Sequence, residues 1–191
     1  MSNTLPKNVH IYLESNPNPN SLKFVVNEML VPDGLSFDFP DAQSTDISPL
    51  AKELFEFEFV DRVFFASNFI TVTKKPDIEW FEVQNIVKDF IRTYLDSGKF
   101  VIDLAGTVPV QEEETETIKK IKTILDEYIR PAVEQDGGAI TYHSFQDGVV
   151  KVKLQGSCSG CPSSTVTLKA GIENLFTRMM PGEVKAVEAL A

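Results

Sequence analysis

The chain has 191 residues, 42% of them hydrophobic, and a formal net charge of −10 at pH 7. This hydrophobic content is that of an ordinary globular protein and excludes global disorder, and the length suits one large domain or two small ones. The negative charge argues against partners that are themselves anionic, namely nucleic acid and membrane surfaces.

The N-terminal half carries the patterns of a small domain, which we place at residues 1–98. Alternating or short apolar runs bounded by turn residues predict four strands, at 9–15, 22–30, 62–67 and 69–75. One helix is predicted to begin after an N-cap at Ser48, and Asp77 is predicted to cap a longer helix that ends at Gly98. Together these elements indicate a mixed β-sheet with helices.

An acidic segment without sustained periodicity, residues 99–114, is predicted to link this domain to a second one at residues 115–191. The second domain opens with a helix in which Pro131 predicts a kink or an early end. Asp147 and Gly148 mark a two-residue hairpin between two strands, and a helix and a third strand follow further along. The order is α-β-β-α-β, so the chain is predicted to be α+β, with two helices on a small sheet in its C-terminal domain.

Both cysteines of the chain, Cys158 and Cys161, lie in the segment QGSCSGCPSS between a predicted strand and a predicted helix. Pro162 suits the first position of that helix, which places Cys161 at or near the N-cap. The unpaired N–H groups and the positive dipole end of the helix favour a thiolate there. Three chemistries remain open for such a pair: a reversible disulfide, part of a metal site, or packing alone.

The residues around the two cysteines are small. Gly156 and Gly160 let the backbone fold tightly and bring N–H groups close to sulfur or to a bulky inorganic guest. Ser157 and its neighbouring serines add hydroxyl groups without bulk. The loop is therefore predicted to hold negative charge close to the main chain.

The number of sulfur ligands limits what one chain can bind. Iron–sulfur clusters and structural zinc sites usually have four protein ligands, and Cys158 and Cys161 supply two. We expect His10 and His143 to be ordinary side chains, since one lies in the other domain and the other in mid-strand. Two chains related by a two-fold axis would supply four thiolates. A thioredoxin-like dithiol oxidoreductase and a zinc-bridged structural dimer are the alternatives.

The start of the sequence, MSNTLPKNVHIYLES, has neither a signal-peptide pattern nor an Arg-rich transit pattern. No apolar run approaches the roughly 18 residues that span a bilayer. We therefore expect a cytoplasmic protein whose thiols stay reduced, a setting in which a CxxC pair is more often catalytic or metal-binding than a structural disulfide.

The C-terminal domain resembles the C-terminal domain of NifU-like (Nfu-type) iron–sulfur proteins over about residues 115–190. The resemblance rests on LDEYIRPAVEQDGGAI, on DGVVKVKLQGSCSGCPSSTVTLKAGIENLF and on PGEVKAVEAL, and the family hallmark is complete from Gly156 to Ser164. The N-terminal half is similar to the N-terminal module of the same family, in ESNPNPNSLKFVVNEML and in SPLAKELF followed by VDRVFFASNFITVTK. The segment FEFEFVDRV lacks a glycine that relatives often carry before the valine, and we expect a small loop change there.

This resemblance implies a scaffold or carrier for iron–sulfur clusters rather than an enzyme. It implies that Cys158 and Cys161 of each of two chains bind the irons of a shared cluster of the [4Fe-4S] type, with Gly156, Ser157 and Gly160 next to these ligands. The cluster would come from upstream assembly machinery and pass to apo-proteins by stepwise thiolate exchange. The cysteine-free N-terminal module would dock clients or partners, and neither domain's core is expected to depend on the Cys158 sulfur.

Overall fold

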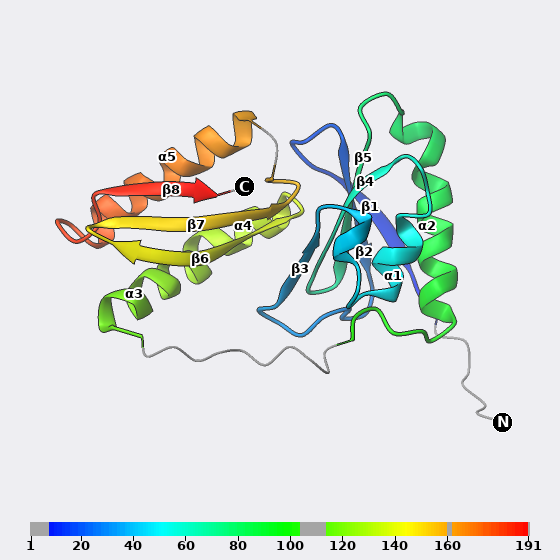
Figure 1. The fold of residues 1–191 in the computed structure, drawn as a ribbon, viewed down its shortest axis with the longest axis horizontal. Coiled ribbons are helices and arrows are strands. Elements are labelled where there is room, and N and C mark those ends of the chain that lie inside the picture. Colours follow the sequence, from blue (N-terminus) through cyan, green and yellow to red (C-terminus); the bar gives the residue numbers. More distant parts are fainter. Residues whose placement is uncertain (1–7, 104–113, 160–161, 191) are drawn as a thin grey trace. The chain divides into compact units, whose positions relative to one another are not determined.

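The computed structural model describes residues 8–103, 114–159 and 162–190, and the chain divides into two compact units, Met1–Val108 and Pro109–Ala191. Both units combine strands with helices (Figure 1), which confirms the predicted α+β class. None of the helices in the described ranges is long and apolar enough to cross a membrane.

The N-terminal unit is an antiparallel sheet with helices on one face (Figure 1). Its elements are β1 (Ile11–Ser15), β2 (Ser21–Val26), β3 (Ser36–Phe39), a 3₁₀ turn (Ala42–Ser44), α1 (Pro49–Leu54), β4 (Val60–Ala66), β5 (Phe69–Lys74) and α2 (Trp80–Asp96). The strand order is β1-β2-β5-β4-β3, and every neighbouring pair is antiparallel. The expectation of a mixed sheet is therefore corrected for this unit. Short turns join β1 to β2 and β4 to β5, and short turns can only make antiparallel pairs.

Two local predictions in this unit also need correction. The strand β3 was not predicted, because SFDF is only four residues long and proline and glycine lie close to it. Asp77 does not cap α2. It lies in a turn in which the Ile78 N–H donates to the Lys75 carbonyl, 3.3 Å away, and the helix begins after Glu79 without a side-chain cap. The N-cap predicted at Ser48 is confirmed, since its hydroxyl accepts from the Ala51 N–H at 3.0 Å.

The core of the N-terminal unit lies between the sheet and its two helices. Its members are buried apolar side chains from strands, α1 and α2, among them Phe24, Val63, Phe65, Ile70, Leu50, Leu54, Val87 and Ile91. Trp80 packs its edge against the ring of Phe24, with ring centroids 6.1 Å apart. This residue is the only tryptophan of the chain, so its fluorescence reports the folding of this unit alone.

Residues 99–103, which the sequence assigned to the linker, contact the N-terminal unit. Val101 and Ile102 pack against its core, and the Ser48 hydroxyl donates to the Val101 carbonyl at 2.7 Å. The Tyr94 hydroxyl donates to the Phe100 carbonyl, also at 2.7 Å. The remaining linker residues 104–113 lie outside the described ranges.

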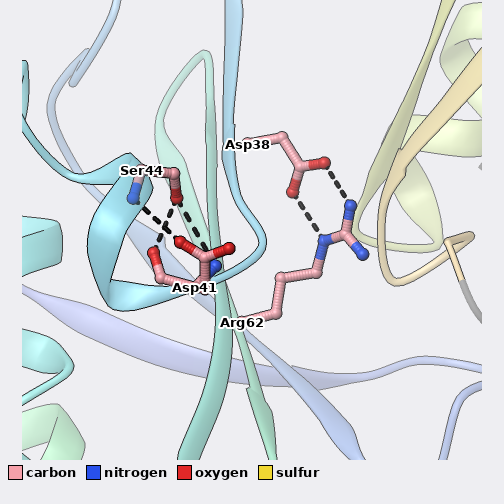
Figure 2. Close-up of polar contacts among 4 residues, drawn as sticks. All are labelled: Asp38, Asp41, Ser44 and Arg62. Carbon is pink, nitrogen blue, oxygen red and sulfur yellow. Dashed lines mark hydrogen bonds and ion pairs between the residues drawn. The ribbon is translucent and has the colours of Figure 1, made fainter.

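A buried ion pair fastens β3 to β4 (Figure 2). Arg62 Nε and Nη2 donate to the two carboxylate oxygens of Asp38 at 2.7 and 2.5 Å. The side chain of Asp38 is 5% exposed, and its hydrogen bond and charge raise the pKa of the Arg62 guanidinium. Nearby, Asp41 and Ser44 form a capping box over the 3₁₀ turn (Figure 2). The edge strand β3 is thus held by side chains at its centre and just beyond its end.

The C-terminal unit has the predicted order α-β-β-α-β. Its elements are α3 (Glu116–Ile124), a π-helical turn (Leu125–Ile129), α4 (Arg130–Gln135), β6 (Gly138–Gln146), β7 (Val149–Gly156), α5 (Pro162–Met179) and β8 (Ala186–Leu190). The sheet order is β6-β7-β8, with β6 antiparallel and β8 parallel to β7. The helix α5 is the crossover that a parallel pair needs.

The first helical segment of this unit continues past Pro131, where the sequence predicted a kink or an early end. The π-helical turn directly precedes α4, in which Pro131 occupies the first turn. A wider turn of this kind re-aligns the backbone where a proline removes an N–H donor, so the helix changes its winding instead of ending. The predicted hairpin is confirmed, with positive φ at both Asp147 and Gly148.

The ion pair between Asp38 and Arg62 gives a first prediction. Arg62→Met would leave a buried carboxylate without its guanidinium, and the N-terminal unit should lose about 3 kcal/mol of unfolding free energy. Urea unfolding followed by Trp80 fluorescence measures this loss. The double variant Asp38→Leu/Arg62→Met should recover part of it, since no charge then stays buried. A double variant less stable than Arg62→Met would contradict this account.

A second prediction concerns Tyr94, whose pKa is raised by burial and, to a smaller extent, by the charge of Glu53. Its hydroxyl can hold Phe100 only while protonated. Because the pKa is higher in the folded state, this contribution is complete below the unfolded pKa of about 10 and declines as pH rises through the folded value. Tyr94→Phe should therefore cost about 1 kcal/mol at pH 8, and the difference from the parent should narrow above pH 10. Parallel urea titrations at several pH values test this, and a constant difference would refute it.

Candidate functional site

The cysteine loop connects the end of β7 to the start of α5. The strand ends at Gly156, whose φ of +65° turns the chain in a conformation that favours glycine, and the helix starts at Pro162 as the sequence predicted. Gly160 and Cys161 lie outside the described residues, so their predicted roles remain predictions. The structure describes the first half of the loop, up to Ser159.

Cys158 is part of the core of the C-terminal unit. Its relative exposure is 5%, and it belongs to the same buried cluster as Ile140, Leu154 and Ile172. The sulfur lies 4.0 Å from the Ser157 hydroxyl oxygen. The expectation that neither core depends on this sulfur stays a prediction, because burial places the sulfur in the core but does not measure what it contributes. Cys158 lies in the turn that follows β7, as expected of a loop residue, and its side chain packs inward.

Ser157 fastens the loop to the turn between α4 and β6. Its hydroxyl donates to the Asp136 carbonyl, and its backbone N–H donates to the Gly137 carbonyl at 3.3 Å. The residue is 3% exposed. Ser157 lies directly before Cys158. Its side chain and its main chain together bind it to a turn that lies about 20 residues earlier in the chain.

Gly138 is a site residue that sequence reasoning missed. A Cβ added to it would lie 2.7 Å from the Gln155 carbonyl oxygen, 2.8 Å from Cys158 Sγ and 3.2 Å from Cys158 Cβ, so only glycine leaves room for the cysteine and the paired strand. It pairs with Gly156 across the β6–β7 ladder. The available signal was the double glycine after Asp136: a helix C-cap needs one glycine, and Gly137 with φ +76° fills that role. The second glycine therefore had no local explanation.

The described residues do not complete a metal site on their own. No group of three or more His, Cys, Asp and Glu side chains within them is arranged to hold a metal ion. His10 and His143 are both exposed, the first before β1 and the second at a register shift in β6. Sulfur donors at Cys158 and Cys161 fit soft, thiolate-binding metals, and two of them leave half of a tetrahedral set to be supplied from elsewhere.

Family models match most of the chain in two parts. A model described as the N-terminal domain of the scaffold protein Nfu/NifU matches residues 11–98, and a model described as a NifU-like domain matches residues 121–188. The two matches fall one in each compact unit.

Curated relatives match along almost the whole chain. The mitochondrial NFU1 iron–sulfur cluster scaffold homolog of Drosophila persimilis is 41% identical over 185 residues, which cover 95% of this chain and 65% of that protein. The homolog from Drosophila grimshawi is 43% identical over 181 residues, covering 93% of this chain and 60% of that protein. The chain spans slightly less than two thirds of the length of these relatives. A solved NifU-like protein from Saccharomyces cerevisiae is 26% identical and covers 53% of this chain and 92% of its own, with a TM-score of 0.47.

The burial of Cys158 gives a third prediction. Cys158→Ser places a hydroxyl where a sulfur packs among apolar side chains, and the C-terminal unit should lose about 1–2 kcal/mol but stay folded. Far-UV circular dichroism during urea unfolding measures the loss, while Trp80 fluorescence should be unchanged because it reports the other unit. Unchanged stability of the C-terminal unit would show that the sulfur is not part of its core.

Proposed function

Because the chain belongs to the Nfu/NifU family of scaffold proteins, we propose that it binds an iron–sulfur cluster between two copies of itself and passes the cluster to apo-proteins. The observation that carries the proposal is the pair Cys158 and Cys161 in a glycine- and serine-rich loop between β7 and α5. The cluster is what the protein carries, so the protein has to bind it at a place from which it can leave again.

The number of ligands supports a shared cluster. Iron–sulfur clusters are usually held by four thiolates, and each chain has two cysteines. The [4Fe-4S] type that we propose follows from the family resemblance. A two-fold axis through the cluster would bring Cys158 and Cys161 of both chains to it, and the cluster would then lie at a subunit boundary. A site at a boundary opens when the subunits part. That geometry suits delivery better than permanent storage.

Transfer then needs only the exchange of one thiolate for another. Each iron–sulfur bond to the scaffold breaks as a thiolate of the apo-protein forms the corresponding bond, so no electron and no external reagent is required. The cluster keeps its charge state throughout. Scaffolding of this kind is not catalysis of a substrate reaction, in agreement with a family described by its scaffold role.

The N-terminal unit is proposed to dock clients or partners. Both cysteines of the chain lie in the other unit, and the N-terminal unit has a complete hydrophobic core of its own. It can therefore present a rigid surface without contributing a ligand. The cytoplasmic location expected from the N-terminal sequence stays a prediction, and the Drosophila relatives are named as mitochondrial proteins.

Anaerobic reconstitution with ferrous iron and sulfide tests the proposed function. The chain should become brown, absorb broadly at about 400 nm, bind about four irons per two chains and elute as a dimer. Cys158→Ser and Cys161→Ser should each prevent both colour and dimer. A colourless monomer that reduces insulin disulfides would establish the oxidoreductase instead, and a colourless dimer that falls apart with chelator would indicate zinc.

A further inference from the structure

The space beside Gly138 is filled by the sulfur of Cys158. A methyl group on Gly138 would come within 2.8 Å of that sulfur, which is closer than real Cβ atoms approach any heavy atom. Not every glycine in this unit is needed for space: at Gly171, in the middle of α5, an added Cβ would meet nothing within 4 Å. Gly138 therefore forms a notch on β6 that is shaped to receive the thiol of a residue twenty positions later.

A second set of contacts keeps the thiol in this notch. The Ser157 hydroxyl donates to the Asp136 carbonyl and its N–H to the Gly137 carbonyl, so the two residues that precede Gly138 hold the residue before Cys158. Gly138 pairs with Gly156 in the ladder, which fixes the distance between the two backbones. The hydrogen bond from the Ser157 hydroxyl to the Asp136 carbonyl is made by a side chain and is not part of the β6–β7 ladder. We call this hydrogen bond the latch.

The sheltered thiol conflicts with metal binding in place. A metal ion bonded to a sulfur must occupy space next to it, and a shared cluster must reach the sulfur from outside the domain. Cys158 is 5% exposed. The residue therefore has to leave its position in the core before it can serve as a ligand.

We propose that Gly138 and Ser157 are positioning residues that hold the Cys158 thiol in a sheltered state, and that cluster loading begins when this contact opens. The inference rests on the proposed function and adds a step to it. In the sheltered state the thiol is protected from oxidants and stray metals. Opening is a local event, because it breaks one side-chain hydrogen bond and leaves the β6–β7 ladder in place.

The test uses the accessibility of one thiol in the full-length, cluster-free chain. In a Cys161→Ser background, Cys158 is the only cysteine, and its rate of alkylation by iodoacetamide is compared with the rate in 6 M guanidinium chloride. Ser157→Ala removes the latch but keeps the backbone bond to Gly137. Gly138→Ala fills the notch, and Gly171→Ala is the matched control for a glycine-to-alanine change.

Sheltering predicts that alkylation in the folded parent is at least about 100-fold slower than in the unfolded chain. Ser157→Ala should speed it about five-fold, the effect of one lost hydrogen bond on an opening equilibrium. Gly138→Ala should speed it about ten-fold or more, and Gly171→Ala should leave it unchanged. The added methyl group of Gly138→Ala would also meet the Gln155 carbonyl oxygen at 2.7 Å and can weaken the strand pair. If Gly138→Ala does not fold, the alkylation rate of Ser157→Ala decides whether the thiol is sheltered. A folded parent that reacts as fast as the unfolded chain overturns the inference.

A second measurement separates positioning from mere stability. In chains with both cysteines, Ser157→Ala should speed cluster uptake by about the same factor as alkylation, while the unfolding equilibrium constant of the C-terminal unit should rise by no more than the roughly five-fold effect of one hydrogen bond. Faster alkylation with unchanged uptake overturns the proposed step. A chain that shelters its thiol yet takes up no cluster refutes the proposed function, whereas uptake by a chain with a readily alkylated Cys158 refutes only the inference.

Discussion

Gly138 and Gly156 face each other across the β6–β7 ladder, and the absence of a side chain at Gly138 leaves the space that the sulfur of Cys158 occupies. The rest of the C-terminal unit is arranged around this contact. The turn after α4 supplies the carbonyls that hold Ser157, and the core of Ile140, Leu154 and Ile172 closes over Cys158. A single methyl group on Gly138 would disturb sulfur and ladder together.

The same contact connects packing with function. A thiol that packs in a core adds to stability, and a thiol that binds iron has to be reachable. One cysteine cannot do both at once, so the proposal requires Cys158 to leave the core in a second, less populated arrangement. Small residues favour such a change of conformation, since Gly156 and the serines of the loop meet little steric hindrance when the backbone turns. The glycines of the loop therefore suit the proposed metal binding as well as the turn of the backbone.

The two units differ in the interactions that stabilise them and in whether they contain the cysteines. The N-terminal unit has large buried aromatic side chains, a bidentate ion pair that fixes its edge strand and a C-terminal extension held by Tyr94 and Ser48. Its residues do not include a cysteine. The C-terminal unit has both cysteines and a smaller core. Because each core is complete within its own unit, a change of the cysteine loop need not disturb the unit that we propose to dock partners.

The sequence by itself determined the class of the fold, most of the elements and the position of the two cysteines. Periodicity showed the strands and helices, the Asp147-Gly148 turn set a hairpin, and two cysteines in one loop set the shortage of ligands, because these features depend on local residue order. The structure alone decided that β3 exists, that α2 starts at Trp80 and that the N-terminal sheet is antiparallel throughout. It also decided that Cys158 lies in the core against Gly138, since the turn predicts that the two strands pair but neither the register shift between Tyr142 and Ser144 nor the direction of the chain after Gly156.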